Sequence, residues 1–277
     1  MNLGWSLLLI AVTTGAAIAA MLLVRRNAPD GSFFNDGDRA AGVFGVLATG
    51  FAILLGFVVF LAFTSYDTSR GGAETEAMTV AQQYETAQFL PQDVRLELSQ
   101  ELVCYGRSVV ALEWPRMEAG TEGDAVNPWG IALFETLRTT DPRSAAEQAA
   151  YGKWLDQTSD REIARNSRIH GAEGVVPGPL WLVLFAIAAV IFVFMLFFAD
   201  SGERAVVQAL LIGTVMTVIV ATLLVVEFFD NPFDPGFGSL RPVAMERTLR
   251  ILEEERLVVN ETGPLPCDAL GMALRGS

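Results

Sequence analysis

Residues Ala40–Phe63 read AAGVFGVLATGFAILLGFVVFLAF, an apolar run without a single charged side chain. A helix of about 20 such residues crosses the hydrocarbon core of a bilayer. Three more long apolar runs are present in the chain: Leu3–Val24, Leu180–Phe198 and Ala205–Phe229. No basic residue precedes the first run, so we interpret it as an uncleaved span rather than a signal peptide. The pattern predicts a membrane protein with four transmembrane helices.

The four runs form two pairs, each joined by a short linker, with a long and mostly polar segment between the pairs. Four crossings return the chain to the side on which it starts, so only the linkers Arg25–Arg39 and Asp200–Arg204 face the opposite side. The predicted organisation is transmembrane helices 1 and 2 in residues 1–64, a helical extramembrane domain in 65–178, transmembrane helices 3 and 4 in 179–229, and a C-terminal turn and helix in 230–277.

The central segment carries the start and stop signals of helices. The second span is expected to continue beyond the membrane to about Leu90, and Pro91 suits the first turn of the next helix. That helix is predicted to end at Trp114-Pro115. Asn127-Pro128 and Asp141-Pro142 are typical N-terminal signals, and they predict two further helices.

The tail begins with Asn231-Pro232-Phe233-Asp234-Pro235-Gly236, which predicts a tight turn at the membrane surface. Pro242 then opens an amphipathic helix that carries Met245, Leu249 and Leu252 on one face. We expect this face to pack on the central domain, and the alternative is a free helix that awaits a partner. Because the chain shows no alternating strand pattern, the predicted fold class is all-α.

Charge and composition limit the classes of function. The chain has 19 basic and 32 acidic residues, for a net charge of −13. Nucleic acid is not an expected partner, because no basic patch is available to neutralise phosphates. The acidic residues are interpreted as a solvated surface, and the alternative is a vestibule that concentrates cations near a pore.

No enzyme, metal site or cofactor site is expected. The chain contains no nucleophile elbow, no phosphate-binding glycine loop and no Cys-x-x-Cys pair. His170 is the only histidine, so a transition-metal site is not predicted. Cys104 and Cys267 lie on the same predicted side. We interpret them as two separate buried thiols, and a disulfide is the alternative if that side is oxidising.

The orientation follows from the basic residues in the short linkers. Arg25, Arg26, Arg39 and Arg204 place these linkers in the cytoplasm under the positive-inside rule, and the domain outside. Three arginines just before the third span argue for the opposite orientation: Arg161, Arg165 and Arg168.

The second span carries the candidate pore face. Its members are spaced 4, 3, 4, 3 and 4 residues apart and fall on one side of a helix: Gly56, Phe60, Phe63, Asp67, Arg70 and Glu74. In an oligomer built around these helices, the two phenylalanines would form hydrophobic rings that gate by dewetting, next to rings of charge that select ions. On spacing alone we favour the alternative, in which the phenylalanines pack against neighbouring helices and the charged residues form ordinary pairs along the helix.

Small residues also gather on this span. Gly42, Gly45 and Gly50, together with Gly56, allow close approach of another helix. The pattern predicts that protein, rather than lipid, covers the second span along much of its length.

Four short motifs follow one another along the chain: Gly56–Asp67 (GFVVFLAFTSYD), Glu76-Ala77, Glu113-Trp114-Pro115 and Asp230-Asn231-Pro232-Phe233. In this order and spacing they resemble the bacterial bestrophin-like family, a group defined by sequence. The resemblance covers roughly Ala40–Leu257.

This resemblance implies a four-span protein of the bacterial inner membrane, with a helical domain between spans 2 and 3. True bestrophins are pentameric anion channels with a pore lined by the second span, so Phe60 and Phe63 are expected to form the neck. The resemblance carries no calcium site over to this chain. Bestrophins keep their domain in the cytosol, whereas the linkers here favour an extracytoplasmic domain, and the acidic surface suits cations.

The leading hypothesis is therefore a homo-oligomeric channel for inorganic ions in a lipid bilayer. The alternative is a non-conducting membrane scaffold or sensor whose domain binds a partner. A membrane enzyme is the third possibility, and the chain offers no convergent polar groups for it.

Overall fold

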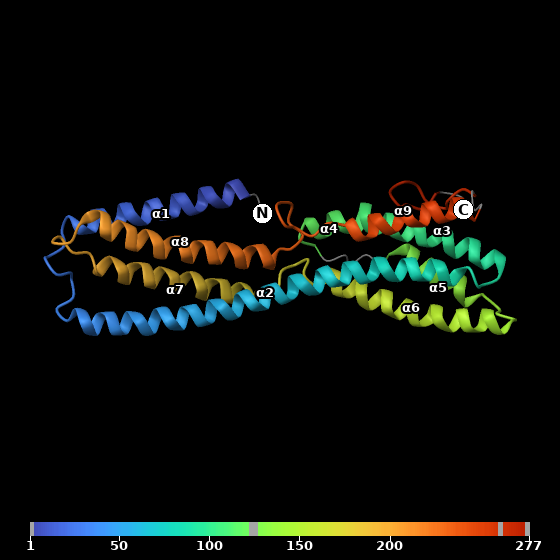
Figure 1. The fold of residues 1–277 in the computed structure, drawn as a ribbon, viewed down its shortest axis with the longest axis horizontal. Helices are drawn as coiled ribbons and strands as arrows, with labels where there is room; N and C mark the ends of the chain where they lie inside the picture. The colour runs from blue at the N-terminus through green and yellow to red at the C-terminus, as the bar shows by residue number, and fades with distance from the viewer. Residues whose placement is uncertain (1–2, 122–126, 260–262, 275–277) are drawn as a thin grey trace. The chain divides into compact units, whose positions relative to one another are not determined.

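The computed structural model describes residues 3–121, 127–259 and 263–274, and most of them are helical (Figure 1). The chain divides into two compact units, which we call the membrane unit and the helical unit. The membrane unit comprises Met1–Ser65, Gly174–Asp230 and Pro235–Gly238, and the helical unit comprises Tyr66–Glu173, Asn231–Asp234 and Ser239–Ser277. Within the described residues, β-structure is limited to an isolated bridge between Cys267 and Ala273, so the all-α prediction is confirmed.

Among the residues that the structure describes, four helices are long and apolar enough to cross a membrane, as the sequence predicts. They are α1 (Leu3–Arg25), α2 (Gly37–Ala87), α7 (Gly178–Phe197) and α8 (Ala205–Asp230). Within the most apolar part of each helix, at most 22% of the residues are buried by the rest of the chain. The remaining apolar surface must therefore be covered by lipid or by other copies of the chain.

Helix α1 packs against α8 in the membrane unit (Figure 1). The hydroxyl groups of Thr14 and Thr217 lie 3.0 Å apart and form a hydrogen bond between the two helices. A Cβ atom at Gly213 would lie 3.1 Å from the side chain of Ile18, so the absence of a side chain there permits the close approach. The N-terminal half of α2 contributes Phe51, Leu55 and other side chains to a core shared with α7 and α8.

The two short linkers of the membrane unit are bonded to one another. The carboxylate of Asp200 accepts a hydrogen bond from the backbone N–H of Gly31 at 3.0 Å, and Ser201 donates to Asp30 at 2.6 Å. The ring of Phe34 also packs against Phe198, with ring centroids 4.9 Å apart. These contacts hold the ends of the spans together on that side.

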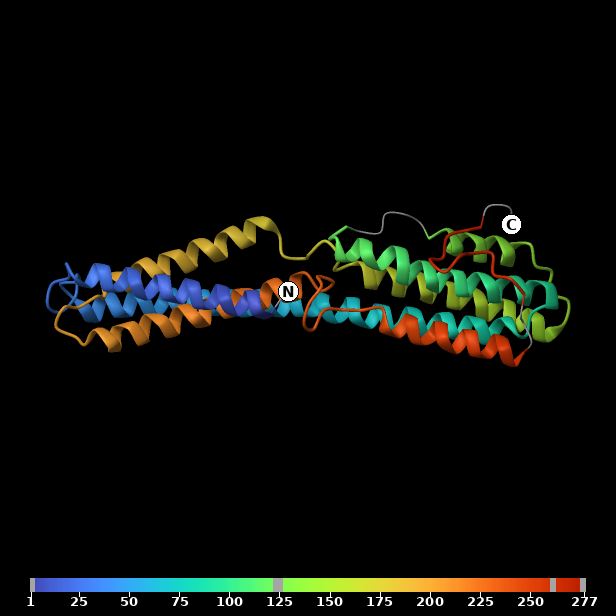
Figure 2. The same cartoon turned by 90° about the horizontal axis from the view of Figure 1, so that it is seen from above.

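The helical unit contains the second half of α2 and six further helical elements (Figure 2). They are α3 (Gln92–Ser108), the π-helix η1 (Val109–Glu113), α4 (Trp114–Glu118), α5 (Pro128–Arg138), α6 (Ala145–Ile169) and α9 (Val243–Val258). Their core is built around large buried side chains such as Trp154, Tyr84, Tyr105 and Leu98.

Two predicted helix boundaries are wrong, and both have a local cause. The helix that was expected to end at Trp114-Pro115 continues through η1 into α4, because the chain changes to a π-helical turn directly before Trp114 and so accommodates Pro115 without ending the helix. Helix α6 begins at Ala145 and not at Asp141-Pro142, because Ser144 and Glu147 form a reciprocal capping box. The predicted cap at Asn127 is confirmed, since its side chain accepts from the backbone N–H of Trp129 at 3.0 Å.

Helix α9 packs on the helical unit as expected, so the free-helix alternative is wrong. Met245 and Leu252 are buried, and the hydroxyl group of Thr248 donates to the carbonyl oxygen of Ala77 on α2 at 3.0 Å. On the side of α3, a Cβ atom at Gly106 would lie 2.8 Å from a methyl carbon of Leu249, so a larger residue there would require the Leu249 side chain to shift.

A disulfide joins Cys104 on α3 to Cys267 in the tail, with Cα atoms 5.8 Å apart. The interpretation as two separate thiols is therefore wrong. The tail is fixed at further points: the indole N–H of Trp129 donates to the carbonyl oxygen of Gly271 at 2.6 Å, and Gly271 adopts a φ of 78° against Ser108. The disulfide closes a loop of 163 residues.

Removing this disulfide should destabilise the helical unit. The variant Cys104→Ser/Cys267→Ser is expected to lose about 2–5 kcal/mol of unfolding free energy, because the closed loop restricts the unfolded chain. Thermal unfolding in detergent checks this, with reductant as the control. Reductant should lower the Tm of the natural protein and leave that of the variant unchanged, and an equal response of both would contradict the prediction.

Candidate functional site

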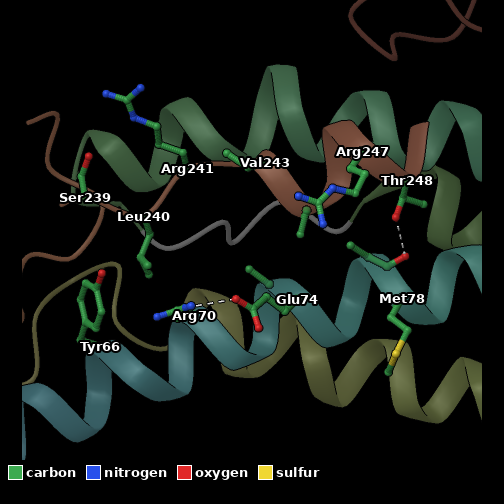
Figure 3. A pocket seen from close by; sticks show the side chains of 13 residues that line it. Tyr66, Arg70, Glu74, Met78, Ser239, Leu240, Arg241, Val243, Arg247 and Thr248 are labelled. Carbon is green, nitrogen blue, oxygen red and sulfur yellow. Dashed lines mark hydrogen bonds and ion pairs between the residues drawn. The ribbon is translucent and has the colours of Figure 1, made fainter. Parts of the chain in front are cut away.

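The face of α2 that the sequence singles out is exposed in both units. In the membrane unit, Phe60 is 67% exposed and Phe63 is 46% exposed, and Gly56 lies on the same exposed side. In the helical unit, Asp67, Arg70 and Glu74 are exposed as well. The guanidinium group of Arg70 donates to the carboxylate of Glu74 at 3.1 Å, which is the ordinary pair along a helix that the alternative interpretation expects (Figure 3).

The apolar part of this face is longer than the sequence analysis recognised. Val46, Ile53 and Phe60 are 76%, 70% and 67% exposed and follow a repeat of seven residues, and Phe57, which is 65% exposed, lies between the last two at the spacing of a heptad pattern. This period is typical of a seam where helices pack on one another. Phe63 lies beside this seam, and its ring makes an edge contact with Phe229 of α8 at a centroid distance of 5.3 Å.

The glycines of α2 have no close neighbour within the same chain. A Cβ atom added at Gly42, Gly45, Gly50 or Gly56 would meet no atom within 4 Å. No described helix of the same chain therefore packs closely on them. Close packing through these glycines stays a prediction for contacts with another copy.

The charged part of the face borders a groove of about 680 Å³ between α2 and α9 (Figure 3). Tyr66, Arg70 and Glu74 line it from α2, and Arg247 lines it from α9. Arg241, which precedes α9, lies at the same groove. The groove therefore combines one carboxylate with three guanidinium groups.

A buried ionic network lies inside the helical unit, and the sequence analysis missed it. The guanidinium group of Arg168 on α6 donates to both carboxylate oxygens of Glu76 on α2 and to Glu113 at the end of η1. All three side chains are at most 3% exposed. Glu113 also accepts from Asn127 at 2.9 Å and from Arg165 at 3.3 Å. Two carboxylates thus face two guanidinium groups, which balances the buried charge.

The charges in this network set the protonation of its members. Burial alone would raise the pKa of Glu113, but the positive charges of Arg168 and Arg165 outweigh it and hold that pKa below its ordinary value. The hydroxyl group of Tyr105 donates to Glu76 at 2.6 Å, and burial together with this carboxylate raises the pKa of Tyr105. Glu113 is therefore ionised at neutral pH and acts as an acceptor, and the hydroxyl group of Tyr105 stays protonated.

Two of the four sequence motifs meet at Arg168, and the fourth reaches it through Trp114. Glu76 and Glu113 bind its guanidinium group directly, and that group also lies over the ring of Trp114 at 5.7 Å. The ring of Trp114 in turn contacts Phe233 edge-on, with centroids 5.5 Å apart. Arg161, Arg165 and Arg168 are spaced along one face of a helix, which was the signal available in the sequence. The sequence analysis interpreted these arginines as charges that flank the membrane, so it did not recognise them as a buried face of the helix.

The fourth motif holds the backbone of the membrane unit. The carboxylate of Asp230 is 5% exposed and accepts from the backbone N–H groups of Val175 and Val176 at 2.6 and 2.8 Å. It also accepts from the indole N–H of Trp181 at 3.3 Å. Asp230 therefore fixes the chain that enters α7. The described residues contain no cluster of three metal-binding side chains.

Breaking the buried network from one side should be costly. Arg168→Gln would leave Glu76 buried without a counter-charge and Glu113 with Arg165 alone, with an expected loss of about 3–5 kcal/mol in unfolding free energy. Replacing all three by Arg168→Met, Glu76→Gln and Glu113→Gln should cost less than the single change. The exposed pair of Arg143 and Asp141 supplies the control, and Arg143→Gln should leave the Tm nearly unchanged. Equal losses for the single and triple variants would contradict an ionic role.

Comparison with known proteins was made by sequence and by fold. The model of the Bestrophin-like domain matches residues 9–245. No curated protein sequence matches the chain. The fold is similar to crystal structures of point variants of a bacterial bestrophin homolog from Klebsiella pneumoniae. One has a TM-score of 0.64 and 16% identity, with 94% of this chain and 98% of the other covered.

A second variant of the same homolog has a TM-score of 0.69 at 15% identity, covering 90% of this chain and 97% of the other. A structure described as a membrane protein has a TM-score of 0.67 at 15% identity, covering 92% and 99%. At these identities the structures show a shared fold. The family model covers most of the residues that carry the four motifs and the buried network, and the chain belongs to the Bestrophin-like family.

Proposed function

We propose that the protein is a homo-oligomeric ion channel whose pore is lined by α2. The observation that carries this proposal is the uncovered face of α2, on which an apolar seam with Phe57 and Phe60 leads to Asp67. Around a common axis, such phenylalanines would form rings that exclude water, and the charged residue would lie beside them. The names of the similar structures and the family support the same function.

The conducted ion is either an anion or a cation, and different observations favour each. Family membership favours an anion, as does the pair of exposed arginines Arg241 and Arg247 near α2. The net charge of −13 favours a cation. A subunit number of five comes from the resemblance to true bestrophins alone.

We further propose that the helical unit is extracytoplasmic. The disulfide between Cys104 and Cys267 supports this orientation, because such bonds persist in oxidising compartments. Arg161 and Arg168, which argued for the opposite orientation, are at most 1% exposed. Arg168 is neutralised by the buried Glu76, and Arg161 donates to the buried Gln83 and pairs with Glu162. They are therefore not a basic flank that could interact with headgroups, and the arginines of the short linkers dominate.

A non-conducting scaffold or sensor is the second candidate function. The groove between α2 and α9 favours it, because Arg70, Arg241 and Arg247 all line it and suit an acidic segment of a partner. The two functions differ in whether ions cross the membrane.

The neck supplies the test of conduction. The variant Phe60→Ala/Phe63→Ala should raise ion flux several-fold in liposomes, because smaller side chains widen a dewetted constriction. Flux measured in separate chloride and potassium gradients also identifies the ion. Leu182→Ala on α7 is a matched control, since Leu182 is 69% exposed and lies on another span; its flux should stay at the natural level.

Two outcomes would contradict the channel. Unchanged flux in a well-folded double variant would favour the scaffold, and loss of folding would favour the packing interpretation, since a buried phenylalanine contributes about 3–5 kcal/mol. Native mass spectrometry of the same preparation must also show more than one chain per particle, because the α2 helix of a single copy cannot form rings.

The orientation is tested by labelling single cysteines with a membrane-impermeant maleimide on intact spheroplasts. Asp141→Cys in the helical unit should react, and Asn35→Cys in the linker should react only after lysis, because both positions are exposed but lie on opposite predicted sides. The natural cysteines are paired and give little background. The reverse pattern would place the helical unit in the cytoplasm. Gly123 is less suitable, because it lies outside the described residues.

A further inference from the structure

The groove between α2 and α9 carries charge of the opposite sign to the chain as a whole. The chain has a net charge of −13, yet the charged residues that line the groove are mostly basic: Arg70, Arg241, Arg247 and Glu74. All of its lining residues belong to the helical unit, so one compact unit forms the whole groove. The volume of about 680 Å³ is within the range of small-molecule sites.

Two guanidinium groups line the groove from different walls, Arg70 on α2 and Arg247 on α9 (Figure 3). The side chain of Arg70 is 60% exposed and uses Nε for Glu74, which leaves the N–H groups of its two terminal nitrogens for a ligand. Arg247 is exposed, and among the described residues its side chain has no ion-pair partner. Arg241 extends away from α2 in Figure 3, so we give it no role in binding. Accessible N–H donors are therefore present on both walls.

The surface around these donors is apolar. Ala73 and Ala77 lie one helical turn apart on α2, and Val243 and Ala244 contribute the first turn of α9. Met78 and Val243 are 55% and 49% exposed. Covering such side chains with a hydrocarbon group is favourable, because it removes apolar surface from water. A hydrated inorganic anion would leave this surface exposed.

We propose that the groove binds a carboxylate ion with a short hydrocarbon body. The carboxylate accepts from Arg247 and from the terminal nitrogens of Arg70, and the hydrocarbon body covers Met78 and Val243. Arg70, Arg247 and Glu74 carry two positive charges and one negative charge, and a single carboxylate balances the remainder. An alkylammonium ion of the same length would instead meet two guanidinium charges. In the sensor function proposed above, on which this biological role rests, the carboxylate is the signal that the helical unit binds.

The test uses the full-length protein in detergent at neutral pH and constant ionic strength. Binding is measured by isothermal titration calorimetry against a detergent blank, with sodium n-hexanoate, sodium acetate, n-hexanol and n-hexylammonium chloride as probes. The last three probes supply the charge alone, the chain alone and the opposite charge. We expect saturable binding of hexanoate, at least about tenfold tighter than that of acetate or hexanol, and no binding of hexylammonium.

Variants assign the binding to the groove. Arg247→Gln should weaken hexanoate binding at least about tenfold, because it removes a charged donor. Glu74→Gln should strengthen binding several-fold, because it removes a carboxylate that competes for Arg70. Met78→Ala should weaken the binding of hexanoate and leave that of acetate unchanged. Arg250→Gln is the matched control, since Arg250 is exposed on α9 outside the groove, and its affinity should equal that of the natural protein.

Three results would overturn the proposal: no saturable hexanoate binding, equal affinities for hexanoate and either acetate or hexanol, or an unchanged affinity in Arg247→Gln. Because Arg247, Glu74 and Met78 are exposed, these variants should keep the natural Tm. The contrast between the four probes in the natural protein decides independently of them.

Liposome flux separates the site from its role. Hexanoate binding together with ion flux would retain the site and favour the channel over the sensor. Absence of hexanoate binding would contradict the site whatever the flux, and would indicate that a protein segment or another copy of the chain covers the groove.

Discussion

The helical unit depends on one buried guanidinium group. Arg168 bonds to Glu76 on α2 and to Glu113 at the end of η1, so α6 carries a charge that is stable only when both partners are in place. The π-helix is part of this arrangement, because its wider turn adds one residue to the helix. If the same residues formed a regular α-helix, which turns by about 100° per residue, Glu113 would lie further around the axis and away from Arg168. The local distortion of the helix is therefore linked to the ion pair.

The parts of the fold that the sequence predicts are those fixed by local rules. The length of Ala40–Phe63 defines a span, and the cap of Asn127 defines a helix start, because each depends only on neighbours in sequence. The start of α6 was placed too early because two cap signals compete, and the capping box of Ser144 prevails over Asp141-Pro142. The partners of Arg168 and the pairing of Cys104 are separated by more of the chain, so no local rule predicts them.

The buried arginines also show why counting charges near a span can mislead. The positive-inside rule concerns side chains that face headgroups and water. Arg161 instead stacks its guanidinium group over the ring of Tyr105 at 4.8 Å and donates to Gln83 at 2.9 Å. The charge of Arg161 is therefore bound inside the helical unit. Arg25, by contrast, belongs to the short linkers and bonds to the carbonyl oxygen of Ser201.

Exposure alone does not distinguish a pore face from a lipid face. Leu182 and Val206 on other spans are as exposed as Phe60, and lipid covers such residues readily. The face of α2 differs in its pattern, because Gly42 and Gly50 leave room for a neighbouring helix beside a seam with a period of seven residues. A lipid-facing surface needs neither small residues nor a fixed period, whereas both features are typical of helices that pack on one another. The pattern on α2 therefore favours contacts between copies of the chain over contacts with lipid.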